Sequence, residues 1–180
     1  MLDVRCTPGF SRDGLTGGKM PKYQGELDGL CGPYAIANAF ELCGVQETQA
    51  TFEAACRSLP AGRWPRTLWE GTSFRDLKRM IRRCRDELPD AAGIRARYPF
   101  EKKPPRSNEE YWKAFDRLFH ESPNICCMII GLTRPDYHWI VASRDSQKRI
   151  VFSDTDPHKP FARKNRASLF AGSKNGNPNK

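Results

Sequence analysis

The distribution of apolar residues divides the chain into a helical first part and a strand-rich last third. Apolar side chains recur three or four residues apart in four segments, which places them on one face of a helix. These predicted helices run from Cys31 to a stop at Gly44, from Thr48 to Leu59, from Ser73 through Cys84 and from Asn108 to His120. Capping boxes mark the start of the third and the fourth.

The last third of the chain changes to a strand pattern. Residues 125–132 form a continuous apolar run, which predicts a buried central strand, and 138–143 and 149–154 flank a polar turn, which predicts a hairpin. A further strand is predicted at 94–100. Because helices come first and antiparallel strands afterwards, we expect an α+β fold. Its N-terminal helices, including the one that begins at Cys31, would pack on one side of a C-terminal antiparallel sheet.

The 180 residues suffice for one domain with its own core, which we expect to cover 1–157. Glycines and prolines interrupt any period in 1–22, so we expect an irregular lead-in there, and 60–71 is expected to be a loop. Residues 158–180 are basic and end in a glycine- and asparagine-rich stretch. A flexible tail is therefore predicted.

Composition narrows the classes of function. No apolar run approaches the roughly 20 residues of a membrane span, and no apolar stretch of a signal peptide follows the N-terminus. We therefore expect a cytoplasmic protein, or an effector exported without a conventional signal peptide. The seven cysteines show no Cys-x-x-Cys pair and no metal-ligand spacing. Free thiols in a reducing compartment are the simplest interpretation, with a disulfide framework as the alternative, and no metal or organic cofactor is implied.

The formal net charge is +9, and cations are densest on the helix that begins at Ser73. Six arginine and lysine side chains lie between Arg75 and Arg85. Such a face suits an acidic protein partner, although most charged helix faces contact only solvent. The chain has no nucleic-acid-binding motif, so we do not expect nucleic acid to be its main ligand.

One cysteine stands at the start of a predicted helix. Cys31 follows a glycine-containing turn, and Pro33 suits the first turn of the helix behind it. The free N–H groups and the macrodipole of a helix N-terminus stabilise a thiolate, so Cys31 would be a nucleophile if a histidine reached it. The alternative is an ordinary buried cysteine.

The predicted hairpin supplies the histidine and a carboxylate. His138 opens its first strand, and a turn centred on Ser146 would set His138 opposite Asp154, close enough to orient the imidazole. A turn shifted by one residue would put Asp156 there instead. We prefer Asp154, because a proline follows directly after Asp156. Gln24 could bind an oxyanion together with the backbone N–H of Cys31, or it could be a loop residue without a role.

These residues carry a resemblance to a known family. Gln24, the stretch Asp-Gly-Leu-Cys-Gly-Pro-Tyr-Ala at 28–35, His-Trp-Ile-Val at 138–141 and Phe-Ser-Asp at 152–154 resemble papain-like cysteine peptidases. The bacterial bacteriocin-processing peptidase-like branch is the most similar. The resemblance implies a papain-like fold and a Cys-His-Asp triad.

The expected function is therefore that of a thiol-dependent hydrolase. It would cleave a peptide or isopeptide bond of a peptide or protein substrate through a thioester acyl-enzyme on Cys31, with no cofactor. A deamidase, transglutaminase or acyltransferase would use the same triad on a protein target. A third hypothesis is a non-catalytic basic binding module in which Cys31 is an inert thiol.

Overall fold

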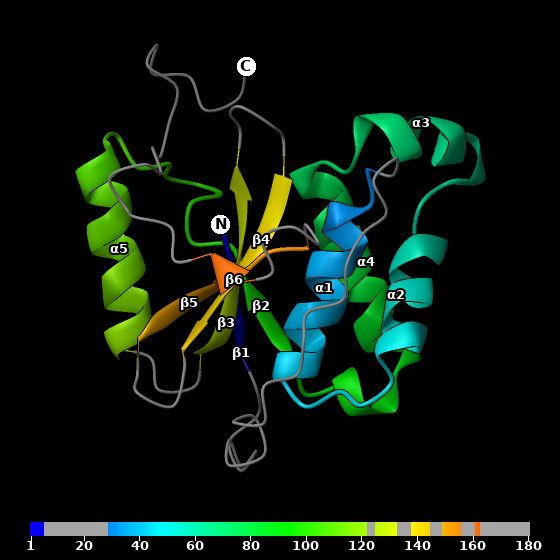
Figure 1. Cartoon of the computed structure of the whole chain (residues 1–180), viewed down its shortest axis with the longest axis horizontal. Coiled ribbons are helices and arrows are strands. Elements are labelled where there is room, and N and C mark those ends of the chain that lie inside the picture. The colour runs from blue at the N-terminus through cyan, green and yellow to red at the C-terminus, as the bar shows by residue number, and fades with distance from the viewer. Residues whose placement is uncertain (6–28, 122–124, 133–137, 145–148, 156–160, 163–180) are drawn as a thin grey trace.

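The computed structural model describes residues 1–5, 29–121, 125–132, 138–144, 149–155 and 161–162, and shows a sheet between helices (Figure 1). The helical elements are α1 (Cys31–Leu42), α2 (Thr48–Arg57), η2 (Ala61–Arg63), α3 (Trp64–Glu70), α4 (Phe74–Glu87), η3 (Pro89–Ala91) and α5 (Asn108–Glu121). The strands are β1 (Leu2–Arg5), β2 (Arg95–Arg97), β3 (Ile125–Leu132), β4 (His138–Arg144), β5 (Ile150–Ser153) and β6 (Phe161–Ala162). The predicted α+β class is confirmed.

All neighbouring strands of the sheet are antiparallel, in the order β2-β1-β3-β4-β5-β6. Strand β1 lies inside the sheet, so the prediction of an irregular lead-in over 1–22 is wrong for its first residues. Leu2 and Val4 are fully buried, whereas Asp3 and Arg5 alternate with them and bond each other at 3.3 Å. The sheet is therefore built from both ends of the chain.

Helices cover both faces of the sheet, which corrects the expectation that they pack on one side. Figure 1 shows α5 on the left of the sheet and α1, α2, α3 and α4 on its right. Consecutive β3 residues alternate between two cores: Ile129 packs with α1, α2 and α4, whereas Ile130 packs with Phe115 and Phe119 of α5. A strand that is apolar at every position needs such cover on both faces.

The connection between α2 and α4 is more ordered than predicted. Residues 60–71, expected to be a loop, contain η2 and α3, and Pro65 lies in the first turn of α3, where its missing N–H costs nothing. Trp64 packs against the core, but the side chain of Trp69 is 74% exposed.

The start of α4 confirms its predicted capping box. Ser73 Oγ accepts a hydrogen bond from the Asp76 N–H at 3.3 Å, and Asp76 accepts one from the Ser73 N–H at 3.0 Å. Arg63 Nη1 also donates to Asp76 at 2.8 Å. These bonds fix the segment that leads from α3 into α4, which contacts the site described below.

Two further predictions concern the ends of the elements. The strand predicted at 94–100 is β2, which is shorter. Within the segment 158–180, predicted as a tail, Phe161–Ala162 forms β6 against β5, and its other residues lie outside the described part of the chain. Among the described residues, no helix has both the length and the apolar character needed to cross a membrane.

Candidate active site

Cys31 is the first residue of α1, as predicted, and only 5% of its surface is exposed. The turn before it is held by a hydrogen bond of 2.7 Å from the Gly29 N–H to the Leu68 carbonyl oxygen. The thiol itself lies 4.0 Å from the Gly29 carbonyl oxygen. The sulfur is thus fixed at the positive end of a three-turn helix, where the peptide dipoles favour an anion.

His138 and Asp154 meet at the start of the β4–β5 hairpin. The His138 Nε2 atom lies 2.5 Å from Asp154 Oδ1, and the two side chains are 16% and 4% exposed. The Cys31 side chain is close enough to His138 to raise the pKa of the imidazole. Because Nε2 contacts the carboxylate, Nδ1 is the ring nitrogen left for the thiol. The structure therefore brings together three of the four predicted site residues.

The charge of His138 follows from these contacts. Burial alone would lower its pKa, but the hydrogen bond to Asp154 and then the nearby Cys31 side chain outweigh burial and raise the pKa to about 9. His138 is therefore an imidazolium at neutral pH. A cation beside a thiol at a helix N-terminus favours the thiolate.

The predicted register of the hairpin is wrong, although the carboxylate is the preferred one. Val141 pairs with Ser153, which centres the turn one residue later than Ser146. Continued to the start of β4, this register sets His138 opposite residue 156, which lies outside the described residues. Asp154 still reaches His138 because it follows directly after β5, and a diagonal cross-strand neighbour lies within side-chain reach.

Thr72, which the sequence did not single out, lies between the nucleophile helix and the histidine strand. Its carbonyl oxygen accepts a hydrogen bond of 3.0 Å from Trp139 Nε1, next to His138. On the other side its hydroxyl lies against Gly32, where an added Cβ would be 2.0 Å from Thr72 Oγ1. This oxygen is buried and has no hydrogen-bond partner among the residues that the structure describes. The Trp139–Thr72–Gly32 contacts, here called the Thr72 bridge, therefore set how closely β4 approaches the start of α1.

Glycine at position 131 completes this packing. A Cβ there would lie 2.7 Å from Trp139 Cζ3, so only glycine lets the indole lie flat across β3. The Trp139 ring also stacks on Phe74 at 6.3 Å between centroids. The aromatic residue after His138 was noted in the sequence only as part of a motif, because its partners come from distant segments.

Most of the described cysteines are free thiols, one is disulfide-bonded, and two of the candidate site residues are not described. Five described cysteines are free thiols: Cys31, Cys43, Cys56, Cys84 and Cys127. Cys126 is disulfide-bonded, so the expectation of free thiols throughout is wrong. Spacing in the sequence does not reveal a pair that only the fold brings together. Gln24 and Asp156 lie outside the described residues, and the oxyanion role of Gln24 stays a prediction.

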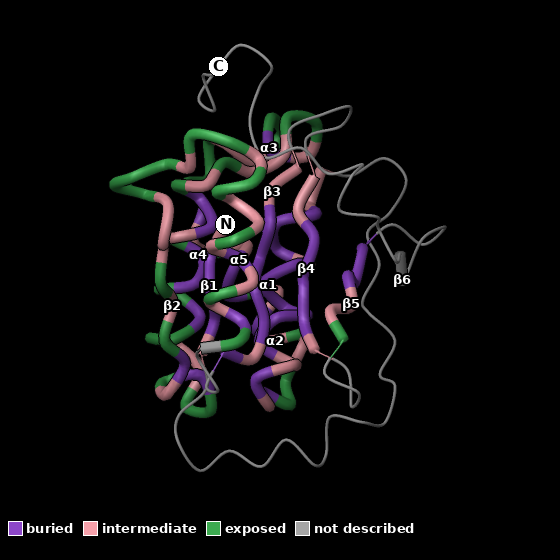
Figure 2. The backbone as a smooth tube through the Cα atoms, turned by 90° about the vertical axis from the view of Figure 1, so that its left-hand side faces the viewer, coloured by how far each residue is buried: buried purple, intermediate pink, exposed green. Residues whose placement is uncertain are grey.

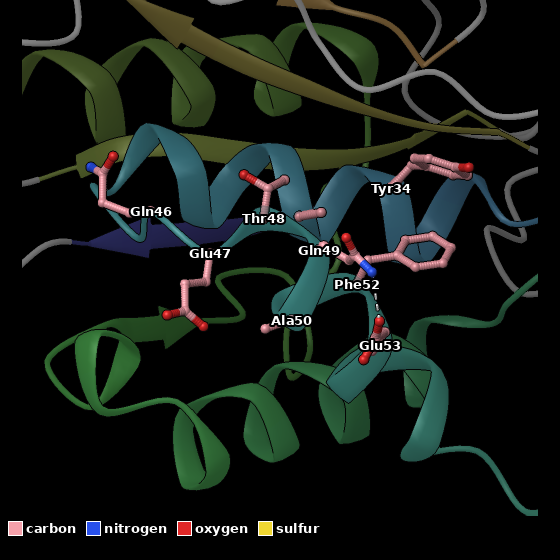
Figure 3. Close-up of a pocket in the computed structure, with 9 residues that line it drawn as sticks. Tyr34, Gln46, Glu47, Thr48, Gln49, Ala50, Phe52 and Glu53 are labelled. Atoms are coloured by element: carbon pink, nitrogen blue, oxygen red, sulfur yellow. Dashed lines mark hydrogen bonds between the residues drawn. The ribbon is translucent and has the colours of Figure 1, made fainter.

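A separate pocket of about 860 Å³ opens between α1 and the start of α2 (Figure 3). Tyr34 and Phe52 meet there with ring centroids 4.7 Å apart, and Gln49 donates a hydrogen bond to Glu53 at 3.0 Å. None of the three triad side chains lines it. Within the described residues, no group of three or more His, Cys, Asp or Glu side chains could hold a metal ion.

Comparisons with known proteins identify no relative. No protein-family model, no curated protein and no solved structure matches this chain. The chemistry of the site is therefore argued from its own residues.

Proposed function

We propose that this protein is a thiol-dependent hydrolase, a papain-like cysteine peptidase that cleaves a peptide or isopeptide bond. One observation carries the proposal: His138 hydrogen-bonds the buried Asp154 with one ring nitrogen, and the Cys31 side chain at the start of α1 is close enough to the imidazole to raise its pKa. A nucleophile, a base and a group that orients the base are the minimum for covalent acyl transfer. The resemblance of the sequence motifs to those of papain-like cysteine peptidases supports the same function.

The proposed reaction has two halves, acylation of Cys31 and hydrolysis of the thioester. The Cys31 thiolate attacks the carbonyl carbon, and the oxyanion that forms is stabilised by the Cys31 backbone N–H and, in our prediction, by Gln24. The His138 imidazolium gives its proton to the leaving amine as the C–N bond breaks, which leaves a thioester on Cys31. Water then attacks the thioester, His138 takes one proton from that water, and the C–S bond breaks to release the carboxylic acid and restore the Cys31 thiolate beside the imidazolium.

Asp154 holds the imidazole in place through both halves. Its carboxylate accepts from Nε2, which keeps Nδ1 directed to the sulfur and stabilises the positive charge on the ring. Being 4% exposed, it does this away from competing water. The buried carboxylate therefore keeps the imidazole of His138 positively charged beside Cys31.

The alternative functions differ in the molecule that accepts the acyl group from Cys31. Incubation with a peptide library, followed by mass spectrometry of the products, would give chain cleavage for a peptidase. A deamidase would change the mass by about one unit, and a transglutaminase or acyltransferase would join two chains.

A mechanism-directed acyl probe tests the nucleophile itself. We expect an electrophilic acyl probe to modify Cys31 in the full chain and not in the His138→Ala variant. Labelling of another residue, or equal labelling without the imidazole, would favour the non-catalytic binding module. The Cys56→Ala variant is the matched control, since it removes a free thiol that touches none of the triad.

A further inference from the structure

Strand β2 ends the sheet on the side away from the candidate active site. It pairs with β1 on one edge, and no described strand pairs with its other edge. Figure 2 shows β2 at the left-hand margin of the molecule, next to exposed segments. An open strand edge offers backbone N–H and C=O groups to an extended chain.

Two arginines of β2 have no counter-ion among the described residues. Arg95 and Arg97 are exposed, while Ala96 between them packs into the core under α1 and α4. The nearest carboxylate across the strand pair, Asp3, is fully buried and already bonded by Arg5. Both guanidinium groups therefore lie on the sheet face opposite α4 and are available to a ligand.

The other flank of the same edge is basic as well. Tyr98, directly after β2, packs on Phe74 of α4 with ring centroids 5.6 Å apart. Lys78 of α4 lies 4.5 Å from the centre of the Tyr98 ring, and Arg82 and Arg85 follow it along the same helix. Burial and then Glu101 raise the pKa of Tyr98, and the positive charges of Arg82 and Arg85 oppose this rise. Arg82 and Arg85 are exposed and form no ion pair with a described residue, whereas their neighbour Arg83 pairs with Glu87.

We propose that this surface, the arginine edge formed by Arg82, Arg85, Arg95 and Arg97, binds an extended acidic segment of a protein partner as an added strand beside β2. Side chains of a strand alternate between the two faces of a sheet. Carboxylates at successive positions would therefore meet Arg95 and Arg97 on one face and the α4 arginines on the other.

Guanidinium groups bind carboxylates through two parallel hydrogen bonds. The backbone of β2 also offers N–H and C=O groups at the spacing of a peptide backbone, which a polynucleotide does not have. A peptide is therefore favoured over nucleic acid. Strands β1 and β3 separate β2 from the histidine strand β4, so the arginine edge binds a partner and does not act on it. The inference does not depend on the peptidase proposal.

The test measures binding of a fluorescein-labelled peptide, Glu-Glu-Val-Glu-Glu-Val-Glu-Glu, to the full chain by fluorescence anisotropy. A second peptide carries proline at both valine positions, which keeps the charge and removes the strand-forming N–H groups. We expect saturable binding of the first peptide that weakens as salt increases, and binding at least several-fold weaker for the proline peptide. Equal binding of the two peptides would overturn strand addition.

Paired variants locate the site. Arg95→Gln/Arg97→Gln should weaken peptide binding about fivefold, the scale of two exposed ion pairs. Lys113→Gln/Arg117→Gln removes the same net charge from α5 and should leave binding unchanged, with circular dichroism confirming that both variants fold. Equal losses in the two variants would contradict the proposal. So would a single-stranded oligonucleotide of equal charge that binds the arginine edge more tightly than the peptide.

Discussion

Two kinds of free thiol lie on the side of the sheet that α1, α2 and α4 cover. Cys31 stands at the start of α1, whereas Cys84 and Cys56 lie inside helices and Cys127 lies inside β3. Burial raises the pKa of Cys84 to about 12 and that of Cys56 to about 11. The contact with Cys43 and burial raise the pKa of Cys127 as well.

The partners of these sulfur atoms explain the difference. Cys84 donates to the Thr51 carbonyl oxygen at 3.4 Å and Cys127 to the Ala39 carbonyl oxygen at 3.6 Å. A carbonyl stabilises the protonated thiol. The Gly29 carbonyl oxygen lies 4.0 Å from the Cys31 sulfur as well, so what sets Cys31 apart is the imidazolium of His138 beside it and its position at a helix N-terminus. Burial makes a thiol inert unless the fold also supplies a cation and a helix N-terminus.

Removing one thiol of each kind tests this difference and should give the largest effect. Cys31→Ala should lower hydrolysis of a peptide substrate by about 10⁴-fold or more, because no other group can form the acyl-enzyme. Cys56→Ala removes the half-buried thiol of α2 and should leave the rate within a factor of two, measured as kcat/KM. Comparable losses in both variants would place the activity elsewhere.

Asp154 tests whether the cation distinguishes Cys31. Asp154→Ala should lower kcat by about 10³-fold, because the imidazole loses its orientation and burial then lowers the pKa of His138. Asp154→Asn keeps an acceptor for Nε2 without the charge, so it should recover part of the rate. An NMR titration of the His138 ring should show a lowered pKa in both variants, and an unchanged titration would contradict the account.

The raised pKa of His138 also predicts a pH dependence of stability. The imidazolium stabilises the folded state fully below pH 6.5, and this contribution is lost as the pH rises to about 9, by at most about 3 kcal/mol. Urea unfolding at pH 6 and pH 9.5 measures the difference in free energy. His138→Gln should remove most of it; the same pH dependence in that variant would show that another group is responsible.

A smaller effect concerns the distance between the two halves of the site. Gly32→Ala would press a methyl group onto Thr72 Oγ1 and shift the Thr72 bridge, so kcat should fall about tenfold while KM changes little. Thr72→Ala in the same chain removes the clashing oxygen and should restore part of the rate. A loss of thermal stability without this rescue would mean that the glycine serves packing alone.

The sequence predicted the local elements and the residue types of the site better than their arrangement. The start of α1 at Cys31 and the cap at Ser73 are local signals that a few residues carry. Leu2–Arg5 alternates in polarity, but four residues are too few to separate a strand from an irregular lead-in. The cover of β3 by α5 depends on tertiary packing, which no periodicity contains.

The sequence prediction that His138 pairs with Asp154 placed both residues on the correct face of the hairpin but used the wrong register. A strand has a period of two, so parity kept the carboxylate beside the imidazole although the turn is shifted by one residue. Thr72 was beyond prediction because its partners, Gly32 and Trp139, are 40 and 67 residues away in the sequence. The disulfide of Cys126 was missed for the same reason.

Site-resolved alkylation tests the central claim most directly. At pH 7, iodoacetamide and mass spectrometry of the modified peptides give the relative rates at Cys31 and Cys56. Cys56 is the more accessible sulfur, but its pKa of about 11 leaves it protonated. We predict that Cys31 reacts at least tenfold faster than Cys56, and that His138→Ala abolishes this difference in rate. A faster reaction at Cys56 in the unaltered chain would contradict the account.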